Sequence, residues 1–176
     1  LLLGRILGQA AAIGDKREST LVQSYGPEYR GGACSAQVTI ADSLIHFPYI
    51  TTPDILVCMS HSGYEKYRGQ IAADGILLVD ADLVRPDDFP RCYGIPCTRL
   101  AEEMGLKMAA NIILIGFVTA ITGVVSREAA RQTVSLSVPR GTEEKNLRAF
   151  ERGWEFAEAT LKGRQKKAAG KTGVVA

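Results

Sequence analysis

The sequence predicts a three-layer α/β domain, with a mixed, mostly parallel sheet and helices on both of its faces. Two nearly continuous apolar runs, Asp54–Ser60 and Gly75–Asp80, are typical of strands that are covered on both sides. Segments with apolar residues at helical spacing follow these runs, and strands that alternate with helices form parallel sheets. The turn Ala41–Ser43 joins two further apolar segments, which predicts an antiparallel pair. These observations indicate a Rossmann-like arrangement.

The first part of the chain is expected to hold one helix and three strands. Apolar residues recur at three- and four-residue spacing over residues 1–13, which predicts the helix. Gly4 and Gly8 within it either allow another backbone to approach or are simply tolerated. The three strands are expected at residues 20–23, 33–41 and 44–47. The last two are predicted to pair as a hairpin through the turn at 41–43.

The middle of the chain is expected to supply the parallel strands and their connecting helices. The strands are predicted at residues 54–60, 75–80 and 93–95. The helices are predicted at residues 62–71 and 98–104. Thr98 is expected to cap the second of these helices, because a threonine hydroxyl accepts a hydrogen bond from a free N–H of the first turn.

Three helices are expected after residue 108. The most apolar segment, Met108–Val125, is interrupted by Asn, Thr and Gly, so it predicts a buried helix at 111–122 rather than a membrane span. Ser126 is expected to cap a helix over 127–136, and Thr142 to open the last one. The apolar stripe of that last helix consists of Leu147, Phe150, Trp154, Ala157 and Leu161.

The C-terminal end is rich in Lys, Ala and Gly. We expect residues 1–162 to form the domain and residues 163–176 to form a basic, disordered tail. A solvated end is the favoured interpretation of this basic run, although it would also suit RNA or an acidic partner.

Composition narrows the class of protein. The chain has 176 residues and a formal net charge of +2, so overall charge makes no strong case for nucleic acid or a membrane as a partner. No signal peptide is visible. The cysteines form no CxxC pair, so we expect no metal or iron-sulfur cluster on this chain and a reducing, cytoplasmic location. Cys34 and Cys58 are expected to be buried, because both stand in apolar runs.

The ends of the predicted parallel strands are candidate ligand sites, because open α/β sheets bind ligands there. Ser60 and the residues after it would present N–H groups to a phosphate, or Ser60 simply caps the next helix. Asp80 and Asp82 would bind a ribose hydroxyl or Mg²⁺, or they end the strand in a turn. The turn Tyr93–Pro96 offers only a tyrosine hydroxyl. Neither histidine belongs to a triad pattern, and no GxGxxG motif is present.

The run Ser24–Gly32 is a further candidate site. Three glycines and a proline fix the backbone path of this loop. Tyr25, Glu28 and Arg30 place aromatic and charged side chains on it, which is typical of a contact surface. An arginine there would hold a phosphate or carboxylate with two hydrogen bonds. Alternatively, Glu28 and Arg30 pair with each other or with another subunit.

Most of the chain resembles the gamma subunit of 2-oxoacid:ferredoxin oxidoreductases. The matching segments follow in the same order over residues 1–159. They are Gln23–Glu28 with Arg30–Gly32, Pro53–Val57, Tyr64 with Lys66-Tyr67, Gly75–Asp80 with Asp82–Val84, Gly94–Pro96 with Thr98, Ala110-Asn111 with Leu114 and Gly116, Thr122-Gly123 with Val125-Ser126, and Val138-Pro139 with Gly141–Asn146 and Ala149-Phe150. The loop and the late Gly141–Asn146 segment look most like the 2-oxoglutarate enzyme.

The resemblance implies a subunit that is inactive alone. The complex would convert 2-oxoglutarate, coenzyme A and oxidised ferredoxin into succinyl-CoA, CO₂ and reduced ferredoxin. It implies alpha, beta and delta partner subunits that carry thiamine diphosphate, Mg²⁺ and the iron-sulfur clusters, with ferredoxin contacted indirectly. Pyruvate, branched-chain or indolepyruvate enzymes are alternatives, and so is a free-standing nucleotide-binding protein of the same fold.

The resemblance also bears on the site residues. No catalytic and no metal-binding residue is expected on this chain. The loop that would contact coenzyme A, substrate or another subunit consists of Ser24, Tyr25, Gly26, Pro27, Glu28, Arg30, Gly31 and Gly32. Secondary candidates are Ser60, Asp80 and Asn111. Such gamma chains begin with a strand and a Gly-Gly-Gln-Gly turn, and because this sequence starts within the helix that follows, we expect the natural chain to be longer.

Overall fold

A three-stranded parallel sheet forms the centre of the fold. The computed structural model describes residues 1–25 and 34–171. Strands β3 (Ile55–Cys58), β4 (Ile76–Asp80) and β5 (Cys92–Ile95) pair in the order β3-β4-β5, with Ile55 opposite Ile76 and Leu77 opposite Cys92. The predicted strands at 54–60, 75–80 and 93–95 are therefore confirmed, and the fold is α/β as expected.

Helices cover both faces of this sheet. On one face Leu78 joins the main core with α4 (Ala110–Thr122) and α1 (Leu2–Gln9). On the other face Leu77 and Val79 form a smaller core with Tyr64 of α2 (His61–Tyr67). Alternate β4 side chains thus enter opposite cores, which is why the strand is apolar at nearly every position.

The antiparallel strands form a separate pair within the described residues. Strand β1 (Glu18–Ser24) runs antiparallel to β2 (Ser35–Ala41), from Glu18 opposite Ala41 to Ser24 opposite Ser35. The predicted hairpin partner at 44–47 is wrong, because β2 pairs with β1 and residues 44–47 stay irregular. Pro48, which has no N–H to donate to a ladder, follows directly.

The connecting helices are close to expectation, except for one cap. Short helices follow β3 and β5: α2 is extended by the 3₁₀ turn Arg68–Gln70, and α3 covers Cys97–Glu103. A second 3₁₀ turn, Lys107–Ala109, precedes α4. The N-cap of α3 is Pro96 rather than Thr98. Thr98 lies inside the helix because its hydroxyl donates to Asp80 at 3.2 Å instead of capping its own first turn.

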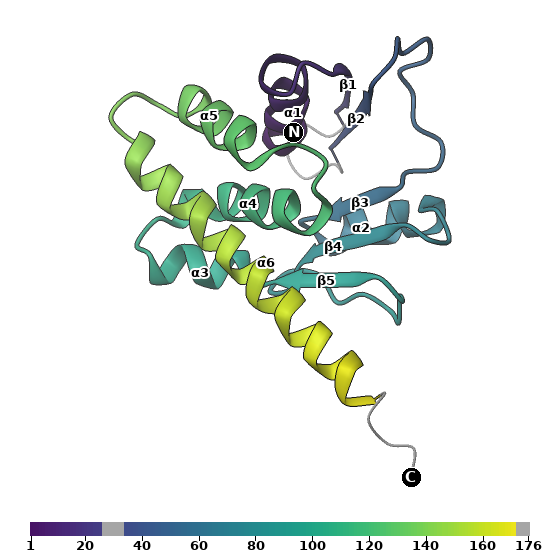
Figure 1. Cartoon of the computed structure of the whole chain (residues 1–176), viewed down its shortest axis with the longest axis vertical. Helices are drawn as coiled ribbons and strands as arrows, with labels where there is room; N and C mark the ends of the chain where they lie inside the picture. The colour runs from purple at the N-terminus through teal and green to yellow at the C-terminus, as the bar shows by residue number, and fades with distance from the viewer. Residues whose placement is uncertain (26–33, 172–176) are drawn as a thin grey trace.

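The C-terminal helices enclose the core from one side. Helix α4 is buried along most of its length and ends at Gly123, which adopts φ 61°. Ser126 caps α5 (Arg127–Ser137) as predicted, accepting a hydrogen bond from the Ala129 N–H at 3.2 Å. Helix α6 (Glu143–Lys171) crosses α4 and then projects away from the body of the molecule (Figure 1).

Helix α6 extends into the segment that was expected to be a disordered tail. It continues to Lys171, so the expectation of disorder from residue 163 is wrong for 163–171. Lysine, arginine, glutamine and alanine all favour helix, and they propagate a helix that the core has already nucleated. The Arg164 guanidinium also stacks on the Tyr93 ring, 3.9 Å from its centroid. The division of the chain at residue 162 stays a prediction.

The cysteines differ in exposure. Cys58 is buried as predicted, and burial raises the pKa of its thiol to about 11. Cys34 is exposed, so its predicted burial is wrong; it precedes the first residue of β2 and packs against neither core. Among residues 1–25 and 34–171, no helix is long and apolar enough to cross a membrane.

Candidate functional site

Asp80 stands at the carboxyl edge of the parallel sheet and is fully buried. Its side chain is 0% exposed. One carboxylate oxygen accepts a hydrogen bond from the Asp82 backbone N–H at 3.0 Å, and the other accepts from the Thr98 hydroxyl at 3.2 Å. Asp80 therefore joins the end of β4 to helix α3, and its burial is compensated by hydrogen bonds.

Asp82 makes a second connection to the same helix. It accepts from the Arg99 backbone N–H at 2.9 Å and from the Arg99 guanidinium at 3.0 Å. Both predicted carboxylates thus bind groups of the protein itself, which matches their interpretation as a strand-ending turn. Binding of ribose or Mg²⁺ at this pair stays an untested prediction.

Ser60 follows β3 and acts as the N-cap of α2. Its hydroxyl accepts from the Gly63 N–H at 3.2 Å and lies 3.4 Å from the Ser62 hydroxyl. This is the capping alternative of the two that the sequence left open. Within α2, the hydroxyl of Tyr64 donates to the Asp87 carboxylate at 3.2 Å. This bond holds the connection that follows β4 against α2.

A shallow cleft of about 270 Å³ opens at the same edge of the sheet. It is lined by His61, Asp82, Leu83 and Arg85. Because Asp82 is paired with Arg99, Arg85 and His61 are the groups that the cleft offers to an anion. The sequence analysis did not name Leu83 and Arg85 as residues of a candidate site. Their position shortly after a parallel strand could have indicated it, because ligands bind beyond the carboxyl ends of such strands.

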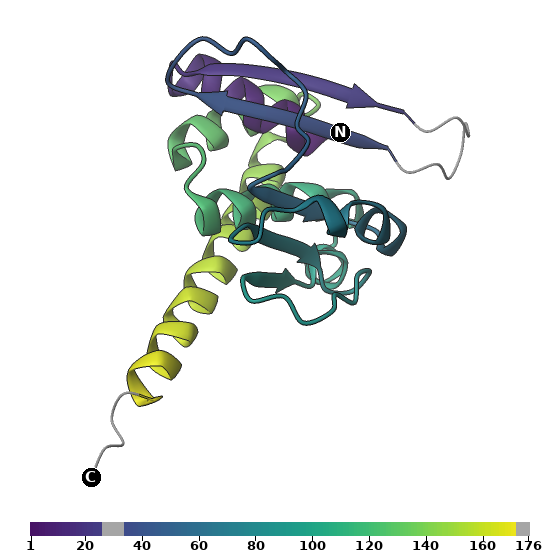
Figure 2. The ribbon, with the colours of Figure 1, turned by 90° about the vertical axis from the view of Figure 1, so that its right-hand side faces the viewer.

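Strands β1 and β2 flank the predicted contact loop, and β2 contacts helix α2. Ser24 ends β1, and the hydroxyl of the exposed Tyr25 donates to the Gln23 side chain at 2.9 Å. At the start of β2, Ser35 accepts from the Tyr67 hydroxyl of α2 at 3.0 Å. Figure 2 shows the arrowhead end of β1 and helix α2 on the same side of the molecule. The remaining loop residues, which are Gly26, Pro27, Glu28, Arg30, Gly31 and Gly32, lie outside the described residues.

Asn111 lies in the first turn of α4. Its side-chain oxygen is buried and has no hydrogen-bond partner among the described residues. Among the described residues, no side-chain hydrogen bond joins Asn111 to Asp80 or Ser60. Within residues 1–25 and 34–171, no three His, Cys, Asp or Glu side chains are grouped closely enough to hold a metal ion.

The fold and these contacts define an α/β domain whose strand-end carboxylates tie its own elements together, as suits a structural or ligand-positioning subunit. The chain belongs to the pyruvate ferredoxin/flavodoxin oxidoreductase family, whose model matches residues 1–156. The resemblance stated from the sequence is confirmed.

Individual relatives support the same assignment. The chain is 48% identical to the 2-oxoglutarate synthase subunit KorC of Methanocaldococcus jannaschii over 163 residues, which are 90% of this chain and 87% of the relative. The gamma subunit of a keto/oxoacid ferredoxin oxidoreductase from Geobacter sulfurreducens superposes with a TM-score of 0.76 at 36% identity, over 90% of each chain.

A larger enzyme shares the fold. The 2-oxoglutarate:ferredoxin oxidoreductase from Magnetococcus marinus, solved with 2-oxoglutarate, coenzyme A and succinyl-CoA bound, superposes with a TM-score of 0.81 at 21% identity. The match covers 90% of this chain but 29% of that one. At this identity the likeness shows the fold alone.

Proposed function

We propose that this chain is the gamma subunit of a 2-oxoglutarate:ferredoxin oxidoreductase. The complex converts 2-oxoglutarate, coenzyme A and oxidised ferredoxin into succinyl-CoA, CO₂ and reduced ferredoxin. One observation carries the proposal: 48% identity to a 2-oxoglutarate synthase subunit, spread over 90% of this chain and 87% of that subunit. Identity over nearly the whole of both chains supports equivalent subunits rather than a shared fold with a different role.

The proposal divides the chemistry between subunits. Thiamine diphosphate, Mg²⁺ and the iron-sulfur clusters belong to partner alpha, beta and delta chains, which also supply the route to ferredoxin. The four thiols of this chain are unpaired, which suits the reducing cytoplasm. The gamma chain packs on its partners and helps to position coenzyme A, and it has no activity alone.

We assign the positioning role to the loop Ser24–Gly32. The strand pair that supports it is fixed along its length, because seven paired positions join β1 to β2, and at the loop end, because Ser35 is bonded to Tyr67. Arg30 is the residue type that binds a phosphate or carboxylate with two hydrogen bonds. Ser60, Asp80 and Asn111 stay secondary candidates.

Co-expression tests the assignment. The chain would be produced together with alpha, beta and delta chains from the same organism and purified through a tag on the gamma chain. We expect a complex that reduces ferredoxin or a viologen with coenzyme A and 2-oxoglutarate. Activity with pyruvate, a branched-chain 2-oxoacid or indolepyruvate instead would correct the substrate. A chain that captures no partner would contradict the subunit assignment.

Arg30→Ala is expected to raise the KM for coenzyme A or for 2-oxoglutarate about tenfold in the assembled complex, since a charge-assisted hydrogen bond contributes about 1.5–3 kcal/mol. Arg30→Lys, which keeps the charge but loses the two-pronged geometry, should recover part of the affinity. Arg17→Ala is the matched control, because Arg17 pairs with Asp42 at the other end of the hairpin. Unchanged KM values for both substrates in Arg30→Ala would leave the loop as a subunit contact only.

A further inference from the structure

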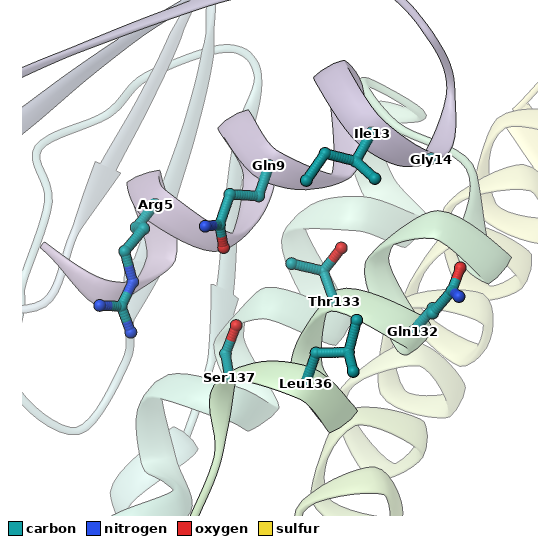
Figure 3. Close-up of a pocket in the computed structure, with 8 residues that line it drawn as sticks. All are labelled: Arg5, Gln9, Ile13, Gly14, Gln132, Thr133, Leu136 and Ser137. Atoms are coloured by element: carbon teal, nitrogen blue, oxygen red, sulfur yellow. The ribbon is translucent and has the colours of Figure 1, made fainter.

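A groove of about 370 Å³ runs between α1 and α5 (Figure 3), and it shares no lining residue with the cleft described above. Helix α1 contributes one wall together with the π-helical turn Ala10–Gly14 that follows it, and α5 contributes the other. The lining residues are Arg5, Gln9, Ile13, Gly14, Gln132, Thr133, Leu136 and Ser137.

One end of the groove is closed by tight packing. A Cβ atom on Gly14 would lie 2.3 Å from the Cβ of Ala129, so the π-helical turn touches α5 directly at this point. Asp15 secures the contact, since it accepts from the Ser126 backbone N–H at 2.7 Å and from the Ser126 hydroxyl at 2.5 Å. The two walls are therefore held together at this end by the Gly14–Ala129 packing and the Asp15–Ser126 hydrogen bonds, so the site is preformed.

Two large apolar side chains stand at the groove without cover. Ile13 is 75% exposed and Leu136 is 80% exposed, although both belong to helices that bury apolar side chains elsewhere. Figure 3 shows them on opposite walls of the groove. Single exposed apolar side chains are common on protein surfaces. Apolar side chains that are grouped at one concave site instead mark an interaction surface.

The charge of the groove is one-sided. Arg5 is the only charged residue among those lining it, and no carboxylate is present there to balance it. Arg5 makes no ion pair with any residue that the structure describes. The other polar groups are amides and hydroxyls, of which Gln9 and Gln132 offer donors and acceptors suited to a peptide backbone.

We propose that this groove receives a segment of a partner subunit that carries an apolar anchor residue and a carboxylate. The anchor packs between Ile13 and Leu136, the carboxylate pairs with Arg5, and the amides bind the backbone of the segment. A protein segment fits this chemistry better than a small ligand does, because Ile13 and Leu136 expose most of their surface and a protein surface can cover both at once. The inference rests on the proposed function and adds the surface through which assembly occurs.

Capture of the co-expressed alpha, beta and delta chains by the tagged gamma chain tests this surface. The double variant Ile13→Asp with Leu136→Asp is expected to reduce capture at least tenfold, and Arg5→Glu to reduce it more than Arg5→Lys does. Met108→Asp is the matched control, since Met108 is 92% exposed and lies outside the groove. Circular dichroism and thermal unfolding of each purified variant establish that it folds, which is expected because these side chains are exposed.

A photo-crosslinking residue gives independent information on the occupant. A complex that carries p-benzoylphenylalanine in place of Gln132 and is otherwise wild-type should, on irradiation, form a crosslink between the groove and a partner subunit. Equal capture by the wild type and the folded groove variants would overturn the inference and leave the proposed function standing. A crosslink to a second copy of this chain would also overturn it. Failure of the wild type to capture any partner would instead overturn the proposed function, and this inference with it.

Discussion

Gly153→Ala is expected to lower the free energy of unfolding of the full chain by about 3 kcal/mol, the upper part of the usual range for overpacking. A Cβ atom at this position would lie 1.8 Å from the Ile113 carbonyl oxygen and 3.0 Å from the Phe117 nitrogen. Both neighbours are backbone atoms of α4, so no side-chain rotation relieves the clash. The two helices would have to separate along the contact that encloses most of the core.

The contact is reciprocal. A Cβ atom on Gly116 of α4 would lie 2.0 Å from the Phe150 carbonyl oxygen of α6, so Gly116→Ala is expected to destabilise to a similar extent. The matched control is Gly163→Ala, in the same helix as Gly153 but with no atom within 4 Å of the added methyl. That variant should gain about 0.5–1 kcal/mol, because alanine is the better helix former. Urea unfolding of the three variants measures these differences. If Gly153→Ala and Gly163→Ala shift the midpoint equally, close backbone contact is not what requires glycine in α6.

The strands of the parallel sheet could be predicted because their signal is local. Ile76–Asp80 is apolar at nearly every position, and each side chain has a core to enter on one face or the other. The same holds for α4, whose continuous apolar sequence indicates burial without any knowledge of its neighbours. For these elements, the local pattern of apolar residues is enough to predict that their side chains are buried.

Elements defined by distant partners could not be predicted in this way. The sequence predicts that the strand at 33–41 pairs with the next apolar segment along the chain, whereas the partner of β2 is β1, which precedes it and is joined to it through a longer connection. By helix propensity alone Gly116 and Gly153 would weaken their helices, because nothing local indicates that the two helices touch there. Thr98 has the composition of a cap, and only the buried Asp80 explains why its hydroxyl is used elsewhere.

The groove between α1 and α5 could not be predicted from the sequence either. Its two walls come from residues 5–14 and 132–137, which are remote in sequence and approach because Gly14 packs on Ala129. Ile13 continues the apolar spacing of its helix, and such spacing by itself favours burial. Its exposure is apparent only once the position of α5 is known. The spacing of apolar residues thus predicts the helix, but the structure is needed to separate the apolar residues of the core from those of a contact surface.

Asp80→Ala is expected to lower the free energy of unfolding by about 3 kcal/mol, because it leaves two hydrogen-bond donors unpaired at a buried site and each costs about 1–3 kcal/mol. The donors are the Asp82 backbone N–H and the Thr98 hydroxyl, which now bind opposite oxygens of one carboxylate. Asp80→Asn keeps an acceptor for the N–H and a polar partner for the hydroxyl while removing a buried charge. It should therefore stay within about 1 kcal/mol of the wild type.

A double-mutant cycle with Thr98→Val separates the two bonds of Asp80. If the carboxylate stabilises the fold partly through Thr98, the combined variant should lose less than the sum of the single losses, with a coupling of about 1 kcal/mol. Chemical unfolding of the four proteins gives this coupling. Strict additivity would mean that Asp80 acts through the Asp82 N–H alone, and a loss below about 0.5 kcal/mol in Asp80→Ala would remove its structural role.

Since the side chain is held by its own fold on both oxygens, we expect Asp80→Asn to support assembly and turnover of the complex at close to the wild-type level. A large loss of turnover in a stable Asp80→Asn complex would instead favour the ligand-binding alternative for this carboxylate.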